Sequence, residues 1–178
     1  MTHNWKQFFP YPQTRKEQEI AIDFALDAFI EQDKKFVVIE AGTGVGKSAI
    51  GFTIAQYYNQ HVGGNGTYYL TTQKVLQQQY MRDFQKRGMF NLQSSTNFQC
   101  KYYKQKTCAM ARRELQITKD QKFKSCCGGG CRYRKAKNDF LAGEHGVTNF
   151  SYFLAETHYA GELSDRTMMV VDECHNAE

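Results

Sequence analysis

The residues with the clearest chemical potential are the eight that read AGTGVGKS and end at Ser48. They fit the phosphate-loop pattern GxxxxGK[ST], with alanine in the first position. In such a loop, glycines let backbone N–H groups surround phosphate oxygens, and the following helix adds its positive dipole. We expect Lys47 to reach the terminal phosphates and the Ser48 hydroxyl to bind Mg²⁺. The alternative is a glycine-rich turn that contains a lysine. The predicted nucleotide-binding residues are Ala41, Gly42, Thr43, Gly44, Val45, Gly46, Lys47 and Ser48.

A second element with matching chemistry is the acidic pair Asp172–Glu173, which follows the apolar run MMVV. A phosphate loop needs a carboxylate at the end of a neighbouring strand to hold Mg²⁺, and a base for the attacking water. We expect Asp172 to position Mg²⁺ and Glu173 to polarise the water. Alone, such a pair is more often a turn after a strand. The upstream phosphate loop favours the catalytic interpretation.

The elements that must position these residues alternate between helix and strand. The sequence Thr14-Arg-Lys-Glu17 has the form of a helix capping box, so a helix is expected to begin near Thr14 and to run to about Gln32. The apolar, β-branched run FVVIE, residues 36–40, predicts a buried parallel strand before the phosphate loop. Further helices are expected over 47–59, 73–87, 133–141 and from about 151, and strands over 67–72, 147–150 and 167–171. This alternation predicts an α/β fold with a parallel sheet flanked by helices.

Positive charge is concentrated in one part of the chain. Residues 99–138 carry a formal charge of +10, the rest of the chain carries −5, and the same window holds five of the six cysteines. This cationic, cysteine-rich segment is called the cysteine island below. Its composition predicts a separate module with a polyanionic partner, although charge runs are often only solvated surface. The expected organisation is therefore a lobe over 1–98 and 139–178, interrupted by the module at 99–138.

The cysteines of the island are candidate metal ligands, although no C-x-x-C pair is present. Cys100 and Cys108 are followed by the adjacent pair Cys126 and Cys127, and then by Cys131. The missing C-x-x-C pair weakens a zinc-ribbon interpretation. Disulfides are not expected in a reducing compartment. Thiolates suit both zinc and iron–sulfur clusters, and some of these residues could simply be buried thiols. Residue type alone leaves these alternatives open.

Taken together, AGTGVGKS followed by Asp172-Glu-Cys-His175 resembles the ATPase core of superfamily 2 helicases, and specifically the XPD and DinG-like iron–sulfur group. The resemblance implies a RecA-like P-loop lobe that binds ATP and Mg²⁺. It further implies that Arg15 and Gln18, in FFPYPQTRKEQ, help to recognise adenine. His175 is implied to couple the nucleotide site to a second motor lobe. The group's Thr-Asn-Tyr-like strand has its counterpart in the TNFSY sequence that begins at Thr148.

The same resemblance favours a 4Fe–4S cluster in the cysteine island, with zinc as the less favoured alternative. Its implied ligands are Cys100, Cys108, Cys126 or Cys127, and Cys131. The lysines, arginines and aromatic residues of the island suit phosphates and unstacked bases. The group also touches DNA with a strand end and the helix that follows it. The predicted DNA-binding residues are Thr71, Gln79, Lys101, Tyr102, Lys104, Lys106, Arg112, Arg113 and Arg132.

These expectations add up to the ATP-binding half of an ATP-dependent DNA helicase, inferred from the group to run 5′ to 3′. Its expected partners are single-stranded and forked DNA and a second RecA-like lobe. The chain ends six residues after Asp172, so this half alone is expected to bind nucleotide without unwinding DNA. The alternative is a non-motor metal-binding nucleic-acid module with a regulatory or vestigial phosphate loop. No apolar run is long enough to cross a bilayer, so no membrane partner is expected. The expected location is intracellular, in the cytoplasm, nucleoid or nucleus. Nucleotide is the only small-molecule substrate expected.

Overall fold

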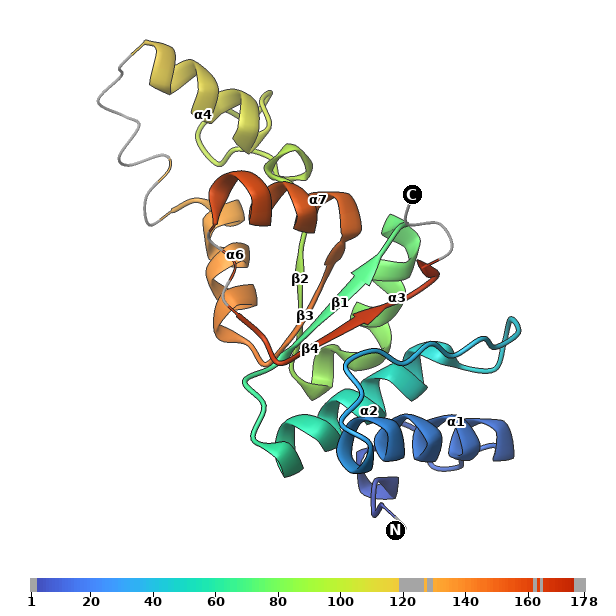
Figure 1. The fold of residues 1–178 in the computed structure, drawn as a ribbon. Coiled ribbons are helices and arrows are strands. Elements are labelled where there is room, and N and C mark those ends of the chain that lie inside the picture. The colour runs from blue at the N-terminus through green and yellow to red at the C-terminus, as the bar shows by residue number, and fades with distance from the viewer. Residues whose placement is uncertain (1–2, 119–126, 128–129, 162, 164, 175–178) are drawn as a thin grey trace. The chain divides into compact units, whose positions relative to one another are not determined.

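The computed structural model describes residues 3–118, 127, 130–161, 163 and 165–174. Four strands form one parallel sheet in the order β2-β3-β1-β4, and helices flank it (Figure 1). The strands are β1 (Thr67–Thr71), β2 (Met89–Leu92), β3 (His145–Asn149) and β4 (Met168–Val171). The longer helices are α1 (Lys16–Leu26), α2 (Lys47–Val62), α3 (Lys74–Phe84), α4 (Cys108–Ile117), α6 (Arg132–Ala142) and α7 (Phe150–Ala155). The predicted α/β class with a parallel sheet is confirmed.

The chain divides into two compact units, which are described separately. The first comprises residues 1–68 and 165–172, and the second comprises 69–164 and 173–178. The predicted partition into a lobe over 1–98 and 139–178 and a module at 99–138 remains a prediction.

In the first unit, helices α1 and α2 lie side by side, and α2 also packs on strand β4 (Figure 1). The buried face of α1 includes Ile22 and Leu26, which are fully enclosed. Helix α1 continues into a π-helical turn at Asp27–Glu31, so the helical region ends close to the predicted residue 32. The Trp5 indole N–H donates to the Asp23 carboxylate at 2.6 Å and ties the N-terminal segment to α1.

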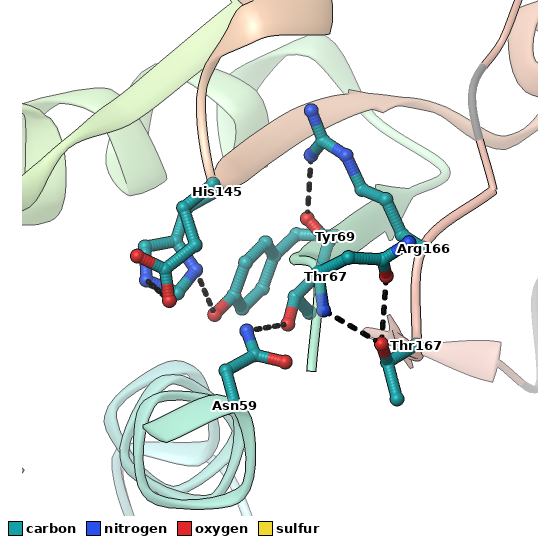
Figure 2. Close-up of polar contacts among 8 residues, drawn as sticks. Asn59, Thr67, Tyr69, His145, Arg166 and Thr167 are labelled. Atoms are coloured by element: carbon teal, nitrogen blue, oxygen red, sulfur yellow. Dashed lines mark hydrogen bonds and ion pairs between the residues drawn. The ribbon is translucent and has the colours of Figure 1, made fainter. Parts of the chain in front are cut away.

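Polar contacts hold β1 to its surroundings in the same unit (Figure 2). The Asn59 side-chain amide, on α2, donates to the Thr67 hydroxyl at 3.0 Å. The Arg166 guanidinium, just before β4, donates to the Thr67 carbonyl at 2.8 Å and lies 4.3 Å from the centre of the Tyr68 ring. The hydroxyl of Thr167 donates to Asn65 at 2.7 Å. These contacts fix the start of β1 between α2 and β4, because a buried polar group such as the Thr67 hydroxyl needs a hydrogen-bond partner.

In the second unit, β2 and β3 run parallel, with Met89 opposite His145 and Leu92 opposite Thr148. Helices α3 and α6 pack on β2 and β3. The Tyr69 hydroxyl, on β1, lies 3.2 Å from Nδ1 of the buried His145 (Figure 2). The cysteine island lies in the connection between β2 and α6. It contains the helix α4, and a short 3-10 helix, Ser95–Asn97, precedes it.

Two local predictions were wrong. Residues 36–40 form no strand, and Phe36 and Val38 are 89% and 81% exposed. Only Val37 and Ile39 are half-buried, and the segment pairs with none of the four strands of the sheet, so its apolar pattern alone did not make it a strand. Helix α1 begins one residue later than a Thr14 cap requires. The Gln18 side chain accepts from the backbone N–H of the N-cap residue Arg15 at 2.9 Å, and the Thr14 hydroxyl instead donates to Glu19 at 2.5 Å.

Candidate nucleotide site and cysteine island

The phosphate loop leads directly into helix α2, as its sequence predicts. Gly44 and Gly46 have φ angles of 81° and 87°, which strongly favour glycine. Gly46 is the N-cap of α2, and its carbonyl accepts from the backbone N–H groups of Ala49 and Ile50 at 3.0 and 3.2 Å. Lys47 and Ser48 are therefore the first two residues of the helix, where the positive dipole end favours phosphate.

Side chains from α1 and the loop itself hold the phosphate loop in shape. Arg15 donates to the Gly44 carbonyl at 2.8 Å, and Gln18 donates to the Val45 carbonyl at 2.8 Å. The ammonium group of Lys47 donates to the Ala41 carbonyl at 3.2 Å. Gln18 is buried while Arg15 is exposed. The structure therefore places Arg15 and Gln18 against the loop, and their expected contact with adenine remains a prediction.

The acidic pair follows the strand on which α2 packs. A Cβ atom on Gly51 of α2 would lie 2.8 Å from Cγ1 of Val170, so the missing side chain allows β4 to approach the helix closely. Asp172 follows directly after β4, within the same unit as the phosphate loop. This is the order of a phosphate-loop site, in which Mg²⁺ is held by the loop serine and a strand-end aspartate. Ser48 and Asp172 carry oxygen donors of the type that Mg²⁺ prefers, and their joint binding of Mg²⁺ remains a prediction.

Glu173 adopts a backbone conformation that is uncommon for its residue type. Its φ angle is 55°, in the left-handed region that non-glycine residues rarely occupy. Such outliers cluster at functional sites because the surrounding structure must stabilise them. The conformation supports the functional interpretation of the acidic pair. His175 lies outside the described residues.

The predicted DNA-binding residues all lie in the second unit. The Thr71 hydroxyl is buried and donates to the Gln73 carbonyl at 3.2 Å, and Gln79 is half-buried on α3. Lys101 lies 6.0 Å from the centre of the Tyr102 ring, and both residues are exposed. The other exposed cationic residues of the predicted set are Lys104, Arg112, Arg113 and Arg132, and Lys106 is half-buried. Exposed cations beside an aromatic face suit a nucleic-acid backbone and its bases.

The described part of the island contains four cysteines. The sulfur atoms of Cys108 and Cys131 lie 3.9 Å apart. Cys100 forms a small apolar cluster with Ala111 and Leu115, against which Cys127 also packs. Burial, reinforced by the Cys131 and Cys100 thiols, raises the pKa of Cys108 to about 11, and the backbone N–H of Tyr133 opposes the rise. A cation bound among these thiols would reverse that shift, because metal ligation deprotonates a thiol.

The donor chemistry of this cluster fits a thiolate-bound metal group. Within the described residues, no group of three or more histidine, cysteine, aspartate or glutamate side chains is gathered closely enough for one metal ion. A cluster distributes its thiolates over several iron atoms, so its ligands need not meet at one point. Cys126 lies outside the described residues. The binding of a metal group by the island remains a prediction.

Sequence reasoning missed two contacts that lie between α6 and the region of α7. The Tyr133 and Tyr152 hydroxyls are 2.7 Å apart, and the Lys137 ammonium donates to the Glu156 carboxylate at 2.6 Å. Burial and the hydrogen bond to Tyr133 raise the pKa of Tyr152 far above its usual range. Each pair is separated by 19 residues, and only the helical spacing of Tyr133 and Lys137, four residues apart, could have indicated a shared face.

Comparison with known proteins agrees with this geometry. The sequence profile of the family described as Type III restriction enzyme, res subunit (ResIII) matches residues 11–178, from before Arg15 to beyond Asp172. A comparison with curated proteins found no match. Along the described residues, no helix has the length and apolar character needed to span a membrane. With a family match over nearly its whole length and a phosphate loop and strand-end aspartate in one unit, the chain belongs to the ResIII family and is a helicase-like ATP-binding lobe.

Proposed function

We propose that this chain is the ATP-binding lobe of a DNA helicase that couples ATP hydrolysis to 5′ to 3′ movement along single-stranded DNA. The observation that carries the proposal is the placement of the phosphate loop on α2 and of Asp172 at the end of β4, the strand that packs on α2. The ResIII match spans both elements. The direction of movement and the preference for DNA rest on the resemblance to the XPD and DinG-like group.

Each residue of the nucleotide site has a distinct role in this proposal. Lys47 and the N–H groups at the start of α2 bind the phosphates, and Ser48 and Asp172 hold Mg²⁺. Glu173 orients the attacking water and accepts its proton. Hydrolysis also needs a second RecA-like lobe, to which His175 couples the site. Nucleotide binding should therefore be measurable in this chain, whereas unwinding should need both lobes.

The nucleotide site is tested by the affinity of the chain for a fluorescent ATP analogue with and without Mg²⁺. Lys47→Ala should weaken binding at least tenfold in both conditions, because the lysine contacts the phosphates directly. Asp172→Asn should abolish most of the increase in affinity that Mg²⁺ produces, while the affinity measured without Mg²⁺ should stay unchanged. Lys16→Ala, an exposed lysine on α1, is the matched control. Equal affinities for all the variants would contradict the proposal.

The cysteine island is proposed to bind a 4Fe–4S cluster and to contact single-stranded or forked DNA. The contact between the Cys108 and Cys131 sulfur atoms and the packing of Cys127 on the cluster of Cys100 support a metal group, and the resemblance favours iron–sulfur over zinc. When bound, such a group would cross-link the island through its thiolates. The test is the visible spectrum and the iron, sulfide and zinc content of anaerobically purified protein. A brown protein with about four irons per chain is expected. One zinc would favour another type of nucleic-acid ATPase, and an absence of metal would leave only buried thiols.

A non-motor module with a regulatory phosphate loop is the competing function, and one comparison separates the two. In a chain that carries both lobes, Lys47→Ala should abolish DNA-stimulated ATP hydrolysis if the lobe is part of a motor. If the parent protein hydrolyses no ATP and retains only DNA binding, the competing function is supported.

A further inference from the structure

A continuous series of contacts connects the end of β1 with the cysteine island in the second unit. It begins at the Thr72 carbonyl, which accepts from the Asn149 side-chain amide at 3.1 Å. The side-chain oxygen Oδ1 of Asn149 accepts from the backbone N–H groups of Ser151 and Tyr152 at 3.0 and 3.4 Å and so caps α7. Asn149 therefore holds the Thr72 backbone with one side-chain atom and the start of α7 with another.

The connection continues from α7 to α6 through a pair of hydroxyls. The Tyr152 and Tyr133 oxygens are 2.7 Å apart, and both side chains are half-buried. Tyr133 lies two residues after Cys131, which is the N-cap of α6. A hydrogen bond between two partly buried hydroxyls is short and directional, so it fixes the position of α7 relative to the first turn of α6.

Tyr133 also contacts the other side of the island. Its ring meets the Phe98 ring edge to face, with the centroids 5.6 Å apart. The Phe98 carbonyl accepts from the backbone N–H of Cys108 at 2.7 Å. One tyrosine is thus bonded to α7 and packed on the segment that positions Cys108. The Lys137–Glu156 ion pair, one helical turn further along α6, is a second link between the same elements.

This inference rests on the proposed function, in which the island binds metal, and on the predicted contact of single-stranded DNA with Thr71 and Gln79, the first and last of residues 71–79. We propose that the Tyr133–Tyr152 hydroxyl pair is a positioning joint that makes DNA binding by residues 71–79 depend on metal loading of the island. Ligation of the thiols fixes the Cys108 segment and the start of α6, and the joint passes this constraint through α7 and Asn149 to the Thr72 backbone. Neither tyrosine needs to touch DNA or metal.

The experiment measures the affinity of the chain for a fluorescent oligothymidylate in two states. One sample is purified with its metal, and the other is stripped by oxidation and chelation, with metal content measured in both. Metal loading should strengthen binding by about fivefold or more, a typical coupling between two sites. Tyr133→Phe and Tyr152→Phe should each bring the ratio of loaded to stripped affinity close to one. The matched control is Tyr58→Phe, which removes a half-buried hydroxyl from α2 in the first unit.

The double variant provides the sharper test. Both hydroxyls make the same bond, so Tyr133→Phe combined with Tyr152→Phe should change the ratio no more than either single substitution. The proposal would be overturned if the two substitutions lowered the ratio of loaded to stripped affinity additively. It would also be overturned if that ratio stayed unchanged, or if DNA binding weakened equally in the loaded and stripped samples. If the parent protein contains no metal, the metal-binding part of the proposed function and the joint both fail. If the parent protein contains metal and binds DNA, but the tyrosine variants keep the parent's ratio of loaded to stripped affinity, only the proposed role of the tyrosine pair is refuted.

Discussion

The side-chain amide of Gln18 donates to the Val45 carbonyl at 2.8 Å and accepts from the backbone N–H of Arg15 at 2.9 Å. One buried side chain therefore begins helix α1 and holds the centre of the phosphate loop. Nucleotide binding and the start of α1 should depend on the same residue.

Gln18→Ala should weaken Mg²⁺-nucleotide binding about tenfold and lower the free energy of unfolding by about 1–3 kcal/mol, because it leaves a buried carbonyl and a helix-end N–H without their partner. The measurements are titration with a fluorescent nucleotide and urea denaturation. The control is Gln13→Ala, which changes an exposed glutamine near the same helix. Unchanged nucleotide affinity in the Gln18 variant would show that the loop holds its shape without this contact.

Gly51→Ala should destabilise the first unit although alanine favours helix. The new Cβ would lie 2.8 Å from Val170 Cγ1. Overpacking costs about 1–3 kcal/mol, which outweighs the gain of about 1 kcal/mol in helix propensity. Adding Val170→Ala should remove the conflict and restore stability in urea denaturation, with Val170→Ala alone as the reference. A double variant no more stable than Gly51→Ala would contradict the close approach of α2 to β4.

The Lys137–Glu156 pair should be strongly sensitive to loss of one partner. The two side chains are only 10% and 14% exposed, so Lys137→Met would leave a partly buried carboxylate without this ammonium group. The free energy of unfolding, measured by chemical denaturation, is expected to fall by about 3 kcal/mol. The matched control is the more exposed Lys106–Glu114 pair, where Lys106→Met should lower the free energy of unfolding by about 1 kcal/mol or less. Similar losses at both pairs would refute the assigned difference.

The adjacent cysteines should differ as ligands. Cys127 packs on the apolar cluster that contains Cys100, and the Arg134 guanidinium donates to the Cys127 carbonyl at 3.1 Å. We therefore expect Cys127→Ser to lose bound metal and its visible absorption, and Cys126→Ser to retain both. Metal analysis of the two purified variants checks this expectation. Retention by Cys127→Ser together with loss by Cys126→Ser would reverse the assignment.

Charge reversal in the island should weaken DNA binding and its dependence on salt. Replacing Lys101, Lys104 and Lys106 with glutamate removes three phosphate contacts, each of which contributes roughly 0.7 to the slope of log affinity against log salt for single strands. Fluorescence anisotropy over a salt series measures this slope. A control triple variant carries the same reversal at the exposed first-unit lysines Lys16, Lys34 and Lys35. Equal slopes for the two triple variants would remove the island from the DNA-binding surface.

Local patterns predicted much of the secondary structure. The phosphate loop, helix α2 and the strand before Asp172 are each encoded by a few neighbouring residues, and all three appear where expected. The apolar character of residues 36–40 did not bring them into the sheet, because strand formation depends on partners elsewhere in the chain. Strand β2, which spans only Met89–Leu92, and helix α4, which lies within the cysteine island, were not predicted.

The candidate site shows the same division between local and distant information. The phosphate-loop residues could be identified from adjacent positions, whereas the bond from Gln18 to Val45 spans 27 residues. The cysteines were evident from composition, but the convergence of Cys100 with Cys127 depends on how α4 folds against its neighbours. The motifs therefore identified the functional residues, whereas the contacts between their side chains became visible only in the folded structure.

The parallel pairing of β2 with β3 has a consequence for how the chain loses its structure. The Thr148 hydroxyl donates to the Leu92 carbonyl at 2.8 Å, and α6 packs on β2, so the sheet around the insertion is complete without residues 93–131. Among the described residues, the island's own core of Cys100, Ala111 and Leu115 is far too small to fold unaided. If the island binds a metal as proposed, removal of that metal should melt the island in a separate, earlier transition and leave the strands and the phosphate loop folded.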